Sequence, residues 1–148
     1  MVKLLSEVKK AYIAGFLDGD GSIYVRAKPN SDYRFGFQIA PYIILFQSSK
    51  EKEKFTELCK LIGFGYMRER KDGVLEYTIN KIADIREFLK AIYPFSILKK
   101  RQIELMLKIL DAKEKIESES DFQALLELVD SYRSLNYSKK RINRVLTP

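Results

Sequence analysis

Apolar and polar residues alternate in two segments of the first third of the chain. In residues 22–28 every second residue is apolar, which is the pattern of a half-buried strand. The alternation resumes in residues 34–47 and predicts a second strand, in which Pro41 removes one ladder hydrogen bond and indicates a bulge or an unpaired stretch. Between them, Lys28-Pro-Asn-Ser-Asp-Tyr33 is rich in turn-forming residues. A strand, a turn and a longer strand are therefore predicted.

The rest of the chain shows mainly helical spacing of apolar residues. Two capping boxes, Ser48 with Glu51 and Ser120 with Gln123, predict where two of the helices begin. A hairpin is expected around Lys71-Asp72-Gly73, with strands at 65–70 and 74–80. Helices are predicted for residues 4–19, from Ser48 to the C-cap Gly63, for 83–92, for 98–115, and from Ser120 onward.

This order of elements, α-β-β-α-β-β-α followed by further helices, predicts the fold class. Paired strands separated by helices indicate one α+β domain over residues 1–148, with an antiparallel sheet covered on one face. The other face would carry basic and aromatic side chains and is too polar to be a second core. A ligand surface is therefore expected there.

Composition narrows the chemistry. The 148 residues include no histidine and one cysteine, Cys59, which excludes an internal disulfide, a zinc site and every His-based nucleophilic arrangement. The net charge is +7, which fits either a nucleic-acid partner or a solubilising surface. Without a signal pattern or a long apolar run, the protein is expected to be soluble, intracellular and independent of membranes.

Small residues recur every four positions in the first helix, at Ala11, Gly15 and Gly19, with Tyr12 beside them. Glycine within a helix costs about 1 kcal/mol relative to alanine, so a close backbone approach is expected there. Because the motif occurs once, the same helix of a second chain is the favoured partner, in a homodimer. Tight packing of this helix on its own sheet is the alternative.

Two carboxylates, Asp18 and Asp20, follow at the end of this helix, where the helix dipole disfavours negative charge. A divalent cation would neutralise them, and ligands that are all oxygen favour Mg²⁺. Their spacing with Ser22 also fits the start of an EF-hand loop. That motif fails because its sixth and twelfth positions would be Ile23 and Pro29.

The segment Ile13-Ala-Gly-Phe-Leu-Asp-Gly-Asp-Gly21 resembles the LAGLIDADG motif of homing endonucleases. The similarity includes Lys28-Pro-Asn30, Ile62-Gly-Phe-Gly-Tyr66 and Pro94-Phe95 before a basic helix start, and extends through Leu135-Asn136. A single motif resembles the homodimeric, intron-encoded branch. The resemblance implies an αββαββα core with an antiparallel saddle-shaped sheet astride DNA, additional C-terminal helices, and metal-dependent hydrolysis of both strands across the minor groove, leaving short 3′ overhangs.

The resemblance also implies roles for residues of the site. Asp20 falls on the metal-binding acid and the Gly19 carbonyl on a secondary metal contact, whereas Asp18 is expected to cap or brace the helix end. Gln47 and Lys99 fall on two polar residues that organise solvent, although a strand-end hydrogen bond and a phosphate clamp are their simpler interpretations. Mg²⁺ is the expected cofactor, with Mn²⁺ substituting and Ca²⁺ binding without supporting cleavage.

The family's basic residue near the site is replaced here by Glu51, flanked by Lys50 and Lys52, so one supporting role stays unassigned. For DNA recognition the resemblance implies a set of side chains on the sheet: Tyr24, Arg26, Lys28, Asn30, Gln38, Tyr42, Arg68, Arg70, Glu76 and Thr78. The basic tail is expected to contact phosphates, unless it is only a solvated charge run: Ser138, Lys139, Lys140 and Arg141.

A site-specific double-strand DNA endonuclease that promotes intron homing, acting as a homodimer without a further protein partner, is therefore the leading hypothesis. An RNA-splicing maturase and a catalytically silent DNA-binding protein on the same fold are the rivals. The chain has 18 Lys and 12 Glu but only four Asn and four Gln, which favours a thermophilic source. A prokaryotic (thermophilic archaeal) cytoplasm or an organelle is the expected location.

Overall fold

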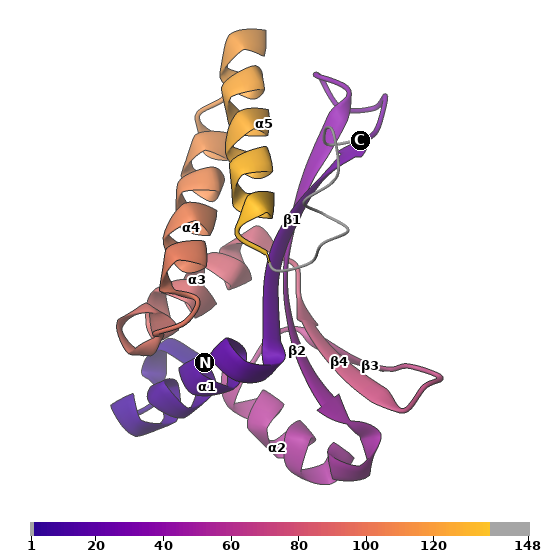
Figure 1. The fold of residues 1–148 in the computed structure, drawn as a ribbon, viewed down its shortest axis with the longest axis vertical. Coiled ribbons are helices and arrows are strands. Elements are labelled where there is room, and N and C mark those ends of the chain that lie inside the picture. Colours follow the sequence, from indigo (N-terminus) through magenta and orange to yellow (C-terminus); the bar gives the residue numbers. More distant parts are fainter. Residues whose placement is uncertain (1, 137–148) are drawn as a thin grey trace. The chain divides into compact units, whose positions relative to one another are not determined.

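The computed structural model describes residues 2–136. By their internal contacts these residues form two compact units, and strands β1 (Gly21–Pro29) and β2 (Phe37–Ser48) each contribute residues to both units. Figure 1 shows the helices and strands in chain order by colour. Of the described residues, the first unit comprises 2–23 and 42–100, and the second comprises 24–41 and 101–136. The four strands of the described residues form one sheet in the order β1-β2-β4-β3, where β3 is Tyr66–Glu69 and β4 is Val74–Ile79. Within residues 2–136, no helix is both long enough and apolar enough to cross a membrane.

The observed order of elements agrees with the predicted α-β-β-α-β-β-α order followed by further helices. The helices are α1 (Glu7–Asp20), α2 (Lys52–Ile62), α3 (Ile82–Ile92), α4 (Lys100–Glu114) and α5 (Glu119–Ser134). The strands are β1 (Gly21–Pro29), β2 (Phe37–Ser48), β3 (Tyr66–Glu69) and β4 (Val74–Ile79). Short 3-10 turns lie at Val2–Leu4, Ser49–Glu51 and Tyr93–Phe95. The α+β class predicted from the sequence is confirmed.

The first unit is built around β4, which pairs antiparallel with β2 on one side and with β3 on the other. Its core contains the inward residues of α1 and the buried faces of α2 and α3: Ile13, Ala14, Leu17, Phe55, Ile62, Ile85, Phe88, Leu89 and Ile92. The predicted hairpin forms as expected, and Gly73 at its turn has a φ of +83°, which favours glycine. Gly63 ends α2 in the left-handed conformation, as predicted.

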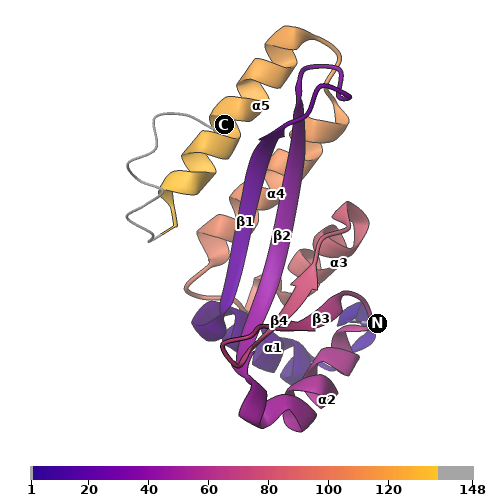
Figure 2. The same cartoon turned by 90° about the vertical axis from the view of Figure 1, so that its right-hand side faces the viewer.

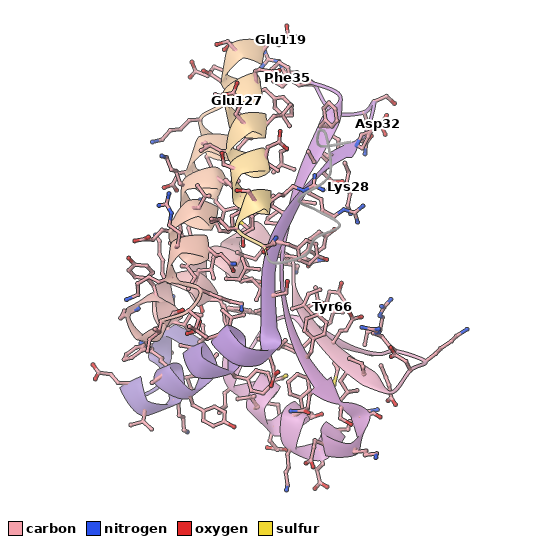
Figure 3. All side chains as sticks on the ribbon, viewed as in Figure 1. Lys28, Asp32, Phe35, Tyr66, Glu119 and Glu127 are labelled. Atoms are coloured by element: carbon pink, nitrogen blue, oxygen red, sulfur yellow. The ribbon has the colours of Figure 1, made fainter. Side chains whose placement is uncertain are left out.

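The second unit contains the far half of the β1–β2 hairpin together with α4 and α5, which lie side by side in Figures 1 and 2. Strand β1 shows the predicted alternation, with Ile23, Val25 and Ala27 buried. Strand β2 begins at Phe37, so the predicted start at residue 34 is wrong. Residues 30–36 form a closed turn instead, in which the Asn30 N–H donates to the Gly36 carbonyl at 2.8 Å. Phe35, which is labelled in Figure 3, belongs to this turn and stacks on Phe122 of α5.

Both predicted capping boxes are wrong, because other side chains make the hydrogen bonds that these boxes require. The N–H of Ser48 is already bonded to Gln47 Oε1 at 2.8 Å, so Glu51 has no donor to accept from. Ser48 instead opens the 3-10 turn, and α2 starts only at Lys52. At α5 the cap is Ser118 with Asp121, two residues before the predicted pair, and both of its reciprocal hydrogen bonds form.

Two further helix starts differ from the predictions. Helix α1 begins at Glu7 rather than at residue 4, because the Ser6 side chain accepts a hydrogen bond from the Lys9 N–H and caps the helix there. Helix α4 begins at Lys100, so Leu98 and Lys99 precede it rather than open it. The N–H groups of both residues donate to the carboxylate of Asp18, which caps the chain just before the helix.

Candidate active site and DNA-binding surface

The predicted metal-binding acid, Asp20, is the last residue of α1 and is exposed. Gly21 follows at once and begins β1. A Cβ at Gly21 would lie 2.8 Å from the Leu17 carbonyl oxygen and 2.5 Å from the Leu17 Cδ1 atom, so glycine is required for the direct change from helix to strand. This sharp junction holds the Asp20 carboxylate at the surface of the first unit.

The second acid of the motif, Asp18, is fully engaged in hydrogen bonds. Its Oδ1 accepts from Ser96 Oγ at 2.7 Å and the Lys99 N–H at 3.2 Å. Its Oδ2 accepts from the N–H groups of Ile97 at 2.8 Å and Leu98 at 3.0 Å. A carboxylate has about four lone-pair sites, so Asp18 has little capacity left for a metal ion. The prediction that Asp18 braces the helix end is confirmed.

The same contacts set the protonation of Asp18. Burial by itself raises the pKa of Asp18, but the hydrogen bonds from Ile97, Ser96, Leu98 and Lys99 outweigh it, and the pKa lies below its ordinary value. Asp18 is therefore a carboxylate at neutral pH even beside Asp20. Ser96, which is only 2% exposed, was not among the predicted residues. A serine shortly before a helix start is the signal that points to it.

Lys99 reaches the end of α1 through its side chain. Its Nζ donates to the Asp18 main-chain carbonyl at 3.0 Å. That carbonyl belongs to the last helical turn, where carbonyl groups lack partners within the helix. The structure thus places a lysine ammonium two residues from Asp20 on the same helix end, although the two residues are 79 positions apart in the chain. Its catalytic role stays a prediction.

Gln47 lies near the end of β2, opposite Leu75 of β4. Its Oε1 accepts a hydrogen bond from the Ser48 N–H, so Gln47 makes the strand-end hydrogen bond that was the alternative to a role in organising solvent. The same hydrogen bond fixes the orientation of the side-chain amide. Glu51, at the family's basic position, forms a 3.9 Å ion pair with Lys54. Lys52 pairs with Glu69 of β3 at 3.1 Å, so this lysine is engaged within the first unit.

The end of α1 fits a hard divalent cation in the chemistry of its donors. Asp20 offers an exposed carboxylate, and Gly19 lies in the last turn, whose carbonyl groups have no helical partner. Mg²⁺ is usually held by one or two carboxylates, with waters and substrate phosphates completing its octahedron. Residues 2–136 contain no group of three or more His, Cys, Asp or Glu side chains placed to hold a metal ion.

The small-residue stripe of α1 faces away from the chain's own core. Ala11, Gly15 and Gly19 are exposed, and a Cβ added at either glycine would meet no atom within 4 Å in the described chain. Two large apolar side chains lie on the same side of the helix, Val8 with 79% exposure and Tyr12 with 65%. Tight packing of the stripe on its own sheet, the alternative interpretation, is therefore wrong.

The predicted recognition residues of β3 and β4 form an ion-pair network. Arg68 and Glu76 are direct partners in the strand register, and Arg68 Nη2 lies 2.7 Å from Glu76 Oε1. Arg70 Nη2 pairs with Asp72 Oδ2 at 2.6 Å, and its Nη1 approaches Glu76 Oε2 to 4.0 Å. The Glu76 side chain is only 15% exposed, whereas that of Arg68 is 68% exposed. Glu76 is thus placed to orient two arginines rather than to project outward itself.

The other recognition candidates divide between the two units. Thr78, on β4, is 7% exposed, and Tyr42 is half-buried. In the second unit, Tyr24, Arg26 and Lys28 occupy the face of β1 opposite its buried residues (Lys28 is labelled in Figure 3), and Gln38 is half-buried on β2. Asn30 shapes the hairpin turn, since its Oδ1 accepts the Asp32 N–H at 3.0 Å. The predicted tail residues lie outside the described residues: Ser138, Lys139, Lys140 and Arg141.

Helix α1 ends in Asp20 and leads directly into β1 of the four-stranded sheet, as the resemblance to the LAGLIDADG motif implied. The model of the LAGLIDADG endonuclease family matches residues 13–110. The chain is 37% identical over 131 residues to DNA endonuclease I-CreI of Chlamydomonas reinhardtii, covering 88% of this chain and 80% of that protein. It is 30% identical over 138 residues to DNA endonuclease I-CvuI of Chlorella vulgaris, covering 91% and 84%. The chain therefore belongs to the LAGLIDADG endonuclease family.

Solved structures agree with this fold. The structure of I-CvuI in complex with its target in the presence of Ca matches with a TM-score of 0.85 and 28% identity, covering 95% of this chain and 88% of that chain. The LAGLIDADG homing endonuclease I-SmaMI, bound to cleaved DNA, matches with a TM-score of 0.73 and 23% identity. That match covers 95% of this chain but 49% of I-SmaMI, so I-SmaMI is about twice as long.

Proposed function

We propose that the chain is one subunit of a homodimeric, metal-dependent homing endonuclease that cuts both strands of a long pseudo-palindromic DNA site, leaves short 3′ overhangs and thereby promotes intron homing. Its relatives I-CreI and I-CvuI are DNA endonucleases, and I-CvuI has been solved with DNA in the presence of Mg and of Ca. The observation that carries the proposal is the Lys99 ammonium, hydrogen-bonded to the last turn of the helix that ends in Asp20.

In this proposal Asp20 and the Gly19 carbonyl hold Mg²⁺, for which Mn²⁺ substitutes, whereas Ca²⁺ binds without supporting cleavage. When bound, the metal activates water and polarises the scissile phosphate. Lys99 stabilises the negative charge that develops on the phosphate oxygens, because its ammonium is already oriented by the Asp18 carbonyl. Gln47, whose Oε1 is held by the Ser48 N–H, donates from Nε2 to position water.

Two features support assembly as a homodimer. The exposed stripe of α1 has room for the backbone of a second helix at Gly15 and Gly19. The chain also covers about half of I-SmaMI but 88% of I-CvuI, as expected of a chain that supplies half of a DNA-binding body. A two-fold axis through α1 would bring two copies of Asp20 close together, which adds to the need for a cation between them.

The proposal is tested by incubating the protein with supercoiled plasmids that carry candidate intron-insertion sites, with and without Mg²⁺. We expect linear product from one plasmid only, and only with metal, because the scissile phosphate is not attacked at a useful rate without it. Omission of Mg²⁺ and addition of Ca²⁺ serve as controls. Splicing of an intron RNA with no cleavage of any plasmid would instead establish the maturase, and site-specific binding without cleavage the silent DNA-binding protein.

The length of β2 sets the expected size of the target. Twelve residues at about 3.3 Å each extend about 40 Å, slightly more than one turn of B-DNA. Two such strands related by two-fold symmetry would cover about two turns, on the order of 20 base pairs. A footprint of one turn or less would contradict this docking.

Substitution of Arg68 by alanine should relax specificity at one position of each half-site and cost about 1–3 kcal/mol of binding, because a bidentate base contact is lost locally. The 2.7 Å contact with Glu76 orients the guanidinium for such a contact.

Replacement of Lys139 or Lys140 should weaken binding equally on all sequences and reduce its salt dependence. Binding titrations on a library of singly substituted targets, repeated at several salt concentrations, check both. Identical specificity profiles of the two classes of variant would refute the assignment.

A further inference from the structure

The segment between the 3-10 turn Tyr93–Phe95 and α4 is not held by its apolar side chains. Ile97 is 81% exposed and Leu98 is 72% exposed, so neither gains much from hydrophobic burial in the described chain. Ser96 is buried, and its N–H donates to the Ile92 carbonyl at 3.1 Å, which anchors the start of the segment. The conformation of the next three residues therefore depends on hydrogen bonds made by their main chain.

All three of these main-chain N–H groups donate to Asp18. Ile97 and Leu98 share Oδ2, and Lys99 donates to Oδ1 together with the Ser96 hydroxyl. The carboxylate thereby accepts hydrogen bonds from the residues that directly precede Lys100, the first residue of α4. Four hydrogen bonds to an ionised acceptor are individually stronger than neutral ones. Asp18 is thus the main tether of this segment to α1.

Lys99 is attached to Asp18 at both of its ends. Its main-chain N–H binds the carboxylate at 3.2 Å, and its Nζ binds the main-chain carbonyl at 3.0 Å. Because Asp18 and Asp20 belong to the same last turn of α1, this double attachment fixes the ammonium relative to the Asp20 main chain. A lysine side chain has four rotatable bonds, and holding both of its ends removes most of that freedom before substrate binds.

We propose that Asp18 is a positioning residue of the cleavage site: its carboxylate clamps residues 96–99 to the end of α1 and so delivers the Lys99 ammonium to the scissile phosphate, without Asp18 itself binding metal. The inference rests on the proposed function, in which Lys99 and Asp20 act on that phosphate. It assigns different work to the two acids of the motif, one to organise the site and the other to hold the cation.

The Asp18→Asn variant tests this clamp. The amide has the size of the carboxylate, but its NH₂ group cannot accept a hydrogen bond, so one pair of N–H or O–H donors loses its acceptor. We expect the single-turnover rate constant for cleavage in Mg²⁺ to fall by about 10- to 100-fold, because the ammonium is no longer held in place. The Kd for target DNA, measured in Ca²⁺, should change less than threefold, because Asp18 makes no base contact.

A double-mutant cycle distinguishes positioning from general stabilisation. If Asp18 acts through Lys99, then Asp18→Asn combined with Lys99→Met should cleave no more slowly than Lys99→Met alone. If the rate losses of the two single variants multiply in the double variant, Asp18 acts independently of the lysine, and the inference is overturned. A slow Lys99→Met variant beside a fully active Asp18→Asn variant would also overturn it, while leaving the proposed function intact.

A matched control uses the other carboxylate that caps a helix. Asp121 accepts from the N–H groups of Glu117 at 3.0 Å and Ser118 at 3.3 Å at the start of α5, in the second unit. Asp121→Asn should lower the Tm without changing the cleavage rate of the folded protein. An equal loss of cleavage in this variant would show that any lost cap slows the reaction, and would remove the special role of Asp18.

A metal-free measurement examines the clamp without cleavage. Amide hydrogen exchange at Ile97, Leu98 and Lys99 should be at least about tenfold faster in Asp18→Asn than in the wild type, whereas Lys99→Met should leave Ile97 and Leu98 protected. Unchanged exchange in Asp18→Asn would overturn the inference whatever the cleavage assay gives. A wild-type protein with these three amides protected that cuts no DNA would instead overturn the proposed function and show that the clamp serves only the fold.

Discussion

Asp20→Asn should bind its DNA target with nearly wild-type affinity and cleave it at least roughly 10²–10³-fold more slowly, the range for loss of one electrostatic group from an active site. The substitution removes the negative charge of the exposed carboxylate at the end of α1 and leaves its shape unchanged. Affinity for a divalent cation falls with that charge, whereas the side chains expected to contact bases lie on the strands. Binding and cleavage should therefore separate.

Gel-shift titration in Ca²⁺ and single-turnover cleavage in Mg²⁺ measure the two quantities on the same preparation. Glu53→Gln, the same change of acid to amide at an exposed position of α2, serves as the control and should behave as wild type in both assays. Full cleavage by Asp20→Asn would remove Asp20 from the metal site. Loss of specific binding by a folded Asp20→Asn protein would show instead that this acid serves recognition.

The sequence predicted the elements well where a single residue or a simple period decides them. The alternation of Ile23, Val25 and Ala27 predicts β1, and glycines at positions 63 and 73 predict a helix end and a hairpin turn because the backbone there needs a positive φ. Helix starts were less predictable. They depend on which acceptor reaches an N–H first, and Gln47 takes the Ser48 N–H that a capping box would have used.

The same limit applies to the hairpin between β1 and β2. Phe35 continues the apolar alternation of the following strand, yet it belongs to a turn and stacks on Phe122, 87 positions later in the chain, with ring centroids 5.1 Å apart. Periodicity reports that a side chain is buried, but it does not distinguish burial in a strand from burial under a distant helix.

For the candidate site, the sequence identified the carboxylates and the physical problem that they pose. Negative charge at a helix C-terminus needs compensation, and a metal ion was the only compensation that a local pattern suggested. The structure adds a second one, because the N–H groups of Ile97, Leu98 and Lys99 stabilise the charge of Asp18 from a segment about 80 positions away. Only tertiary structure brings these groups together. Asp20 is exposed at the same helix end, where the proposed cation would bind.

Gly15→Leu should abolish the homodimer while leaving the fold of each chain intact or slightly more stable. A Cβ at Gly15 meets no atom within 4 Å in the described chain, so the leucine is accommodated in a single subunit. Replacing glycine in a helix also gains up to about 1 kcal/mol of helix propensity. At a two-fold interface built on close backbone approach, by contrast, two added leucines would force the helices apart. The substitution should therefore destabilise the dimer while leaving the single subunit as stable or more stable.

Sedimentation at micromolar concentration, free and with target DNA, should show a dimer for the wild type and a monomer for Gly15→Leu, whose thermal unfolding should be no less cooperative. Cleavage of both strands should be lost as well, because each subunit supplies half of the contacts. Gln123→Leu adds the same side chain to an exposed position of α5 and should remain a dimer. A wild type that sediments as a monomer in both conditions, or a Gly15→Leu protein that still forms dimers, would rule out α1 as the interface. A Gly15→Leu chain that fails to fold would contradict the expectation that a single subunit accommodates the leucine.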